Sequence, residues 1–489
     1  MREATVDHLS PLDLAFWRME SPDHPMHLAA LVRFTADGPD AAQRALEELT
    51  RRAAGVPGLR RRIRDVLLPV GAARWAPDPG FDPARHVGLV RTTAHDPHRA
   101  AGPLMARPLA RDRPPWEAHV IAGPDPAGFA VLFKFHHALA DGLGALALAA
   151  ALFDEADQAP AAPRPASPPR GSRPGPRVPA ADPGSRPLPA AWPPAALRAL
   201  PGALASPSGL RALPGALATR SGLRALPGAL ASRVQDLGQA LEIGAAVARS
   251  GLPLGVPDGL TTPGTHAGER STAGVALPLD EVNRIRRAGG GTVNDVLTAV
   301  VAGALRRWLT GRGEQVDGAG PRALIPVSRR RPRGTAGAGN RLSGYLIRLP
   351  VALPEPLDRL DAVRSEMDRN KEAGPTRGAG AVALLADHVH PLGHRLGGPL
   401  LAHAARLLFD VLVTSVPLPG LTLTLAGSRV AEVYPLAPLA SGQSLAVAVS
   451  TYQGTAHFGL VADTSAVPDL PALAQALHDE LADLLRAAA

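Results

Sequence analysis

The chain has 489 residues, enough for two domains of ordinary size, and it contains no cysteine. The absence of cysteine excludes a thiol nucleophile, a disulfide bond and a cysteine-ligated metal. The formal net charge of +8 comes almost wholly from arginine, and it suits anionic lipid, phosphate groups or nucleic acid as partners. Aromatic residues make up only 3% of the chain, which argues against the base-stacking platforms of nucleic-acid-binding proteins.

The N-terminal segment Met1–His8 lacks the apolar core of a signal peptide. No uninterrupted apolar run reaches the length needed to span a bilayer. We therefore expect no transmembrane helix, and a cytoplasmic protein or one attached peripherally to the inner membrane face or to lipid droplets.

The first elements follow from local signals. Ser10 as an N-cap, Pro11 at the first helical position and Asp13 near the positive end of the dipole predict a helix. Residues 27–34 alternate like a strand, and residues 41–54 have the periodicity of an amphipathic helix. The following arginine run, 60–62, is expected to be a solvated face, with contact to a phosphate as the alternative.

A β-hairpin is predicted next, from strands at 118–121 and 129–135 joined by a turn at 123–126. Its second strand ends in His136 and His137. A strand end lets a rigid sheet present an imidazole to a pocket, so His137 is a candidate general base. A hydrogen-bonded core histidine is the competing interpretation. A metal site is disfavoured, because adjacent strand residues point to opposite faces.

Asp141 and Gly142 follow the histidine pair and predict a tight turn into a helix at 144–153. The segment Gly142–Ala147 also matches a loose dinucleotide-binding fingerprint. No strand with an acidic end follows at the usual interval, so nicotinamide binding is set aside.

Residues 157–266 are rich in Pro, Ala and Arg and are expected to form a partly disordered linker. Within it a 13-residue repeat begins at Leu197, Leu210 and Leu223. Each copy carries leucines and an arginine, a pattern that suits contact with an anionic membrane. A slippage duplication is the alternative, and it is favoured because a proline interrupts every copy.

Beyond the linker, residues 275–285 predict a strand followed by a helix, and Thr292 caps a helix that runs to Trp308. Strands are expected within 321–329 and 339–350 and a helix at 359–371. The apolar stretch 382–412 is expected to be helical and to line a substrate channel or touch lipid. Its four histidines are irregularly spaced, which argues against a metal.

The pattern His136-His137-x-x-x-Asp141-Gly142 resembles the active-site signature of the bacterial wax ester synthase/diacylglycerol acyltransferase family, a branch of the CoA-dependent acyltransferases. Further segments follow the family's order, and the resemblance covers essentially the whole chain outside the linker. They are Pro114–Glu117, Val293–Val296, Gly339–Arg341 and Thr414–Pro419. The last segment departs from the family, because Ser415 and Leu418 stand where Asn and Gly are usual. The bulky leucine is expected to narrow the substrate channel.

The resemblance implies an α/β (α+β) fold of two chloramphenicol-acetyltransferase-like domains, residues 1–156 and 267–489, with mixed sheets, flanking helices and a substrate tunnel between them. It implies transfer of an acyl group from acyl-CoA to diacylglycerol or a long-chain alcohol, with His137 as the base. His136 would orient the loop, and Asp141 and Gly142 would shape it.

The resemblance also implies substrate contacts for Asn294, as an oxyanion donor, and for Asp295, Trp116 and Ser415, although Trp116 also fits a packing role. Acyl-CoA is a co-substrate, and no resident cofactor, metal or nucleic acid is expected.

Three other functions are compatible with parts of the sequence to different degrees. Hydrolase chemistry is disfavoured because no Gly-x-Ser-x-Gly elbow is present. A condensation-type transfer from a carrier protein and a non-catalytic lipid-binding role stay open, and the sequence does not choose between diacylglycerol and a long-chain alcohol as acceptor.

Overall fold

The computed structural model describes residues 7–67, 70–139, 144, 148, 151–155, 260, 268–318, 320–328, 342–373, 409–418, 420, 422–440 and 442–489. Several predicted features lie outside these residues: Asp141, Gly142, the linker repeats, Gly339–Arg341 and residues 382–408. Leu260, which falls within the predicted linker, is fully buried in the core around the second sheet.

The first sheet has seven strands in the order β4-β5-β6-β1-β13-β12-β7. Its strands are β1 His27–Thr35, β4 Val87–Arg91, β5 Trp116–Ala122, β6 Gly128–His136, β7 Asp154–Glu155, β12 Leu423–Leu425 and β13 Ser428–Leu436. The predicted hairpin is confirmed as β5–β6, and β6 also pairs along its length with β1. The histidine strand β6 is therefore held on both edges.

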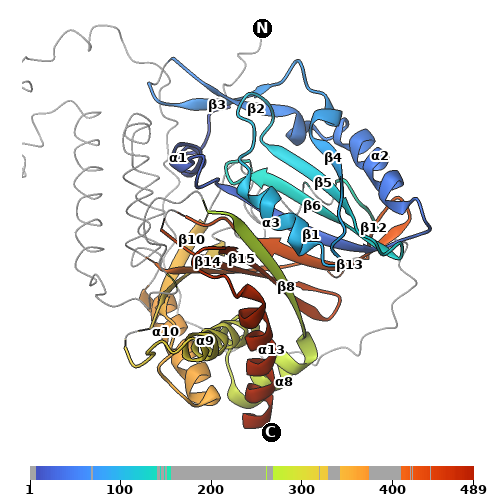
Figure 1. Ribbon diagram of the computed structural model, residues 1–489. Coiled ribbons are helices and arrows are strands. Elements are labelled where there is room, and N and C mark those ends of the chain that lie inside the picture. The colour runs from blue at the N-terminus through green and yellow to red at the C-terminus, as the bar shows by residue number, and fades with distance from the viewer. Residues whose placement is uncertain are drawn as a thin grey trace, which may run out of the picture. The chain divides into compact units, whose positions relative to one another are not determined.

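Two strands of this sheet, β12 and β13, come from the C-terminal part of the chain. Figure 1 shows β13, in orange-red, beside the blue strand β1. The two strands run antiparallel, with Leu31 opposite Tyr434 and Phe34 opposite Val430. The sheet that carries the histidines therefore includes a strand that lies about 400 positions after its partner β1 in the sequence.

The second sheet has six strands in the order β10-β9-β11-β14-β15-β8. They are β8 Arg270–Pro278, β9 Arg322–Ser328, β10 Leu342–Arg348, β11 Val411–Pro417, β14 Leu445–Tyr452 and β15 Thr455–Asp463. β11 runs parallel to β9 and β14, whereas the other pairs are antiparallel. The predicted mixed sheets are confirmed.

Helices cover both sheets. They are α1 Pro11–Met19, α2 Ala41–Ala53, α3 His98–Ala106, α8 Leu279–Gly289, α9 Val293–Gly311, α10 Pro356–Ala373 and α13 Leu470–Ala487, with short 3-10 turns η1 Pro57–Arg60 and η2 Pro83–Arg85. The predicted helices at 10–17, 41–54, 292–308 and 359–371 are confirmed, with small differences at their ends.

The alternation of side chains along β6 separates two apolar cores. Val131 and Phe133 face the cluster that α2 covers, whereas Leu132 packs with Leu31 and with Val461 of the second sheet. A third core surrounds α9, which is almost entirely buried against α10 and α13. Both faces of β6 are therefore covered, which fixes the position of its C-terminal end.

A two-stranded sheet, β2 Arg61–Asp65 and β3 Ala73–Pro77, packs beside α1. Its buried residues Ile63 and Ala73 form a cluster with Trp17 and with Ala138, the residue after the histidine pair. The predicted solvated arginine run opens this hairpin. The sequence patterns had not identified it as paired strands.

Within the described residues no single helix is both long and apolar enough to cross a membrane, and only α8 and α9 together, bent by 99°, reach those limits. Most of α9 is packed inside the protein core.

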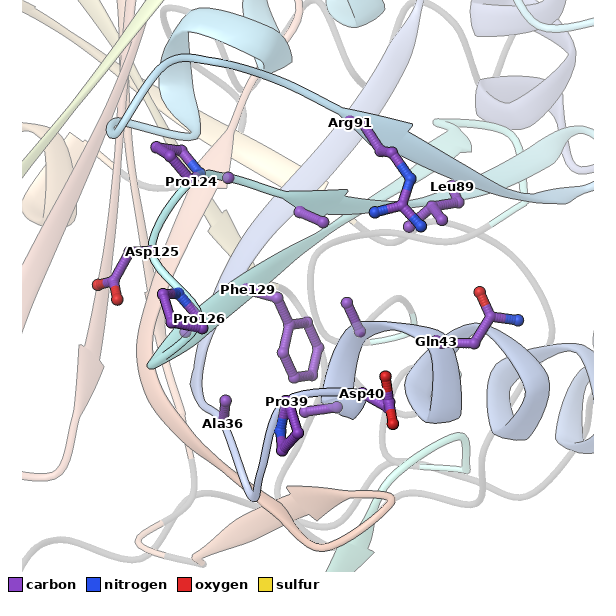
Figure 2. A pocket seen from close by; sticks show the side chains of 15 residues that line it. Ala36, Pro39, Asp40, Gln43, Leu89, Arg91, Pro124, Asp125, Pro126 and Phe129 are labelled. Atoms are coloured by element: carbon purple, nitrogen blue, oxygen red, sulfur yellow. The ribbon is translucent and has the colours of Figure 1, made fainter.

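One hollow of about 200 Å³ lies at the opposite end of β6 from the histidines. Figure 2 shows Phe129 and Pro39 on one side of it and Arg91 on the other. Phe129 precedes His136 by seven residues of extended strand, roughly 23 Å. This hollow is therefore separate from the histidine pair.

Candidate active site

His137 occupies the first position of a turn that directly follows β6. Its backbone N–H donates to the carbonyl oxygen of Met26 at 2.9 Å, which extends the β1–β6 pairing by one residue. Its ring is stacked on Phe16 of α1, with ring centroids 3.9 Å apart and planes inclined by 14°. The side chain is half-buried, so the ring is held without being sealed inside the core.

His136 has a different environment, because it is fully buried. Its Nδ1 accepts from the backbone N–H of Ala138 at 3.0 Å, which assigns the proton of the neutral ring to Nε2. Burial, together with the charges of His137 and Arg111, holds the pKa of His136 well below its ordinary value. His136 therefore favours the neutral ring and accepts a hydrogen bond within the turn.

A buried carboxylate lies behind the histidine pair. Oε2 of Glu20 is 3.7 Å from Nε2 of His136, beyond hydrogen-bond length, and it accepts from Nε and Nη2 of Arg111 at 3.1 and 2.8 Å. Its other oxygen, Oε1, accepts from the backbone N–H of Met26 at 3.2 Å. Glu20 therefore fixes the residue whose carbonyl oxygen holds His137.

Trp17 lies between the Glu20–Arg111 ion pair and the histidines. The guanidinium of Arg111 lies 4.2 Å from the centre of the Trp17 ring, and Trp17 meets the ring of His136 edge-on at 5.0 Å. Arg111 also donates to the carbonyl oxygen of Trp17 at 2.9 Å. One end of α1 thus braces both histidines, with Phe16 on His137 and Trp17 on His136.

The loop before β1 is also tied to the second sheet. Arg270 at the start of β8 forms a buried ion pair with Asp463 at 2.7 Å and donates to the carbonyl oxygen of Asp23 at 3.1 Å. Asp23 lies between Glu20 and Met26 in sequence. The position of the loop that holds His137 therefore depends on residues from both sheets.

A buried lysine supports the same strand. Lys134 donates from Nζ to the carbonyl oxygens of Leu104 and Arg107 at 2.8 and 2.6 Å, and it lies 3.5 Å from a carboxylate oxygen of Glu117. Burial lowers the pKa of Lys134 to about 8. These contacts fasten β6 to the end of α3.

The other predicted site residues lie on different elements. Trp116 is 1% exposed in the first core, where its indole N–H donates to the carbonyl oxygen of Leu59 at 2.8 Å and its ring stacks on His86. These contacts give Trp116 a packing role. Ser415 is half-buried on β11, in register with Val449 of β14.

Asn294 and Asp295 stand in the first turn of α9. Asp295 and Thr292 form a capping box, in which Oδ2 of Asp295 accepts from the Thr292 N–H at 2.7 Å and the Thr292 hydroxyl accepts from the Asp295 N–H at 3.2 Å. The second oxygen, Oδ1 of Asp295, is buried and has no hydrogen-bond partner among the described residues. Asn294 is half-buried. The hydrogen bonds of the described residues do not join either side chain to the histidine turn.

The structure also shows the contacts of Leu418. Its backbone N–H donates to the carbonyl oxygen of Thr451 at 3.2 Å, and its side chain packs against the core cluster on the α2 side of the first sheet. Among the residues that the structure describes, no set of three metal-ligating side chains converges.

Sequence reasoning missed Glu20, Met26 and Arg111, which form the support of the histidine pair. Their only sequence signal was proximity to the helix at 10–17 and to the segment before Trp116. Neither pattern indicates that residues 91 positions apart form an ion pair.

The two mixed sheets and their flanking helices give the chain a fold that is also found in solved structures of acyltransferases. Two solved structures share it. The wax ester synthase/diacylglycerol acyltransferase from Marinobacter aquaeolei VT8 aligns with a TM-score of 0.66 and 21% identity over 98% of this chain and 99% of its own. The trichothecene 15-O-acetyltransferase TRI3 from Fusarium sporotrichioides aligns with a TM-score of 0.54 and 12% identity over 97% and 94%.

The family is defined by sequence. The wax ester synthase/diacylglycerol acyltransferase catalytic domain matches residues 9–297, and the C-terminal domain of the same family matches residues 338–485. A Mycobacterium tuberculosis protein named as a diacylglycerol O-acyltransferase, tgs1, is 30% identical over 98% of this chain and 96% of its own length. The chain belongs to the wax ester synthase/diacylglycerol acyltransferase family and is an acyltransferase enzyme.

Proposed function

We propose that this enzyme transfers a long-chain fatty acyl group from acyl-CoA to the hydroxyl of diacylglycerol, producing triacylglycerol, with His137 as the general base. The substrate class is supported by the family and by the name of the mycobacterial relative. The observation that carries the catalytic assignment is the contrast within the histidine pair. His136 is sealed in the core, whereas His137 is half-buried and held by both its backbone and its ring.

The proposed reaction requires one base and no covalent enzyme intermediate. As the hydroxyl oxygen attacks the thioester carbonyl carbon, its proton moves to a ring nitrogen of His137. The tetrahedral adduct then collapses, the carbon–sulfur bond breaks, and the sulfur takes that proton to leave as the thiol of coenzyme A. An imidazole whose ordinary pKa is about 6.5 can perform both transfers near neutral pH.

The surrounding residues would keep the imidazole in place during these transfers. The Met26 carbonyl oxygen and the Phe16 ring fix the backbone and the plane of His137. His136, which stays neutral, would avoid placing a second positive charge beside the imidazolium that forms. In this proposal Asp141 and Gly142 shape the loop and Asn294 donates to the oxyanion.

Substrate contacts for Asp295 and Ser415 remain part of the proposal. Oδ1 of Asp295, which has no hydrogen-bond partner in the described part of the chain, supports a polar contact at the start of α9, beyond the capping role of this residue. For Trp116 the buried stacking and the indole hydrogen bond favour support of the sheet over contact with substrate.

A long-chain alcohol is the second acceptor we propose, since the matching family is described by both activities. An alcohol needs the same proton transfer as diacylglycerol, so His137 would serve both. The two acceptors differ in bulk beside the hydroxyl, and the shape of the substrate tunnel would choose between them.

The test is acyl transfer by the purified full-length protein, supplied with labelled palmitoyl-CoA and either dioleoylglycerol or hexadecanol. We expect labelled lipid ester from the wild type, and a kcat reduced at least about 100-fold in His137→Ala with palmitoyl-CoA binding retained. His119→Ala, which removes a half-buried histidine from the neighbouring strand β5, is the control and should keep its activity.

Two results would contradict the proposal. Wild-type turnover by His137→Ala would remove this residue as the base. If folded wild-type protein binds palmitoyl-CoA but esterifies neither acceptor, the same label should be offered on an acyl carrier protein. Transfer from that donor would identify a condensation-type enzyme, and its absence would indicate a lipid-binding protein.

A further inference from the structure

The tip of the β2–β3 hairpin exposes apolar side chains. Leu67 is 88% exposed and Val70 is 46% exposed, and they are two of the three large hydrophobic side chains exposed among the described residues. A single exposed leucine is common on a protein surface, but two such side chains at one hairpin tip leave apolar area that water solvates poorly.

Two arginines flank this tip. Arg64 of β2 and Arg74 of β3 are direct cross-strand partners, and both are exposed. Neither guanidinium has a hydrogen bond or ion pair within the described part of the chain. Like charges placed opposite each other on a sheet are destabilising unless a negative group lies between or beside them. The pair is therefore complementary to an anionic partner.

The neighbouring acidic residue does not supply that negative group. Asp65 pairs instead with Arg18 of α1, whose Nη2 lies 2.7 Å from Oδ1 of Asp65 and donates to the carbonyl oxygen of Gly71 at 3.2 Å. These bonds fasten the base of the tip to α1. Asp65 therefore does not neutralise Arg64 and Arg74, and their positive charges lie exposed next to the apolar tip.

The hairpin also packs against the residues that surround the histidine turn. Ile63 and Ala73 pack with Trp17 and with Ala138, which directly follows His137. Figure 1 shows β2 and β3 next to α1, the helix that stacks on the histidine pair. A surface that holds the hairpin would therefore lie close to the histidine turn.

We propose that the β2–β3 hairpin docks the enzyme on an anionic lipid surface. Leu67 and Val70 would enter the boundary between headgroups and acyl chains, and Arg64 and Arg74 would contact headgroup phosphates. A free phosphate would match the arginines but leave the apolar tip in water, whereas a lipid surface matches both. The proposal goes beyond acyl transfer and does not depend on it.

Sedimentation of the full-length protein with vesicles tests the proposal without any turnover. Vesicles of phosphatidylcholine alone are compared with vesicles that also contain phosphatidylglycerol. We expect binding to the mixed vesicles that weakens in high salt. Leu67→Gln/Val70→Gln should lower the vesicle affinity at least about tenfold. Arg64→Gln/Arg74→Gln should lower it about 30-fold.

Matched controls distinguish a specific effect of the hairpin on vesicle binding from the effect of removing any exposed positive charge or any exposed apolar side chain. Arg91→Gln/Arg429→Gln removes the same net charge from exposed positions of the first sheet, and Leu357→Gln removes the third large hydrophobic side chain that is exposed among the described residues. Both controls should bind like the wild type. Because the hairpin substitutions are at exposed positions, thermal unfolding should stay unchanged and confirm that every variant is folded.

Three results would overturn the proposal. The first is equal vesicle binding by the wild type and both hairpin variants. The second is loss of binding on deletion of the linker repeats, residues 197–233, while the hairpin variants bind normally. The third is a lipid-independent change of oligomeric state in Leu67→Gln/Val70→Gln, measured by light scattering, which would identify the tip as a protein–protein contact.

Discussion

Replacement of Glu20 should impair catalysis although this residue lies behind the histidine pair. Its carboxylate is 4% exposed and accepts from Arg111 and from the Met26 N–H, and the Met26 carbonyl oxygen in turn accepts from His137. Glu20→Ala removes the acceptor for both donors. The loop before β1 then loses the contact that fixes Met26, and the His137 backbone moves with it.

The magnitude follows from these contacts. An amide N–H left without its acceptor costs about 1–3 kcal/mol. The lost ion pair adds little, because the Arg111 side chain is 46% exposed and water can solvate it. We expect Glu20→Ala to lower the free energy of unfolding by about 2 kcal/mol and to lower kcat by roughly 10- to 100-fold through displacement of the base.

The assay is urea unfolding together with steady-state kinetics, using palmitoyl-CoA and dioleoylglycerol. Because Glu20 acts through position, KM for palmitoyl-CoA should change little while kcat falls. Glu20→Gln keeps one carbonyl acceptor for the Met26 N–H, so it should recover most of kcat. Glu47→Ala, which removes an exposed carboxylate from α2, is the control and should match the wild type.

A folded Glu20→Ala protein with wild-type kcat would refute this reasoning. If Glu20→Gln were as inactive as Glu20→Ala, the charge of Glu20 would matter rather than its hydrogen bonds. The role would then be electrostatic stabilisation of the imidazolium on His137.

Two further predictions concern buried side chains. Trp116→Phe loses the hydrogen bond to the Leu59 carbonyl oxygen. This variant should lower the free energy of unfolding, measured in urea, by about 1–2 kcal/mol and leave KM for palmitoyl-CoA unchanged. An unchanged free energy of unfolding with a raised KM would instead assign Trp116 to the substrate site. Burial lowers the pKa of His98 to about 4, so the unfolded chain takes up its proton first as the pH falls below 6.5. His98 therefore stabilises the fold less at acidic pH, by about 2 kcal/mol at pH 5 relative to pH 7. Other buried histidines, such as His136, also have a lowered pKa and contribute to the loss in both proteins, so urea unfolding should show a loss in His98→Phe that is smaller than in the wild type by about this amount. Parallel pH dependence of the two proteins would contradict the assignment.

Local chemistry allowed the sequence to determine much of this protein. The helix at α1 was predictable because Ser10 supplies the cap, whose hydroxyl accepts from the Asp13 N–H at 3.2 Å. The cap at Thr292 was predictable for the same reason. The hairpin β5–β6 followed from alternation and turn residues, and it placed His137 at a strand end. The ordered motifs identified the family, which the comparisons confirm.

Capping chemistry also shows where the sequence was ambiguous. Asp295 was predicted to contact substrate, and the structure engages one of its oxygens with Thr292 at the start of α9. The same short polar side chain suits both roles, so its identity alone does not separate them. The arginines at 61 and 62 were ambiguous in a similar way, because a charged run does not reveal whether it forms the edge of a hairpin.

Only the tertiary structure decided which distant segments meet. Pairing of β13 with β1 joins residues about 400 positions apart, and the ion pair of Glu20 with Arg111 joins residues 91 positions apart. Periodicity specifies which face of a strand is buried, but it does not specify which other strand covers its edge. The motif indicated His137 as the candidate base, whereas the contacts of Glu20, Met26 and Trp17 with the histidine pair arise from packing that no local pattern encodes.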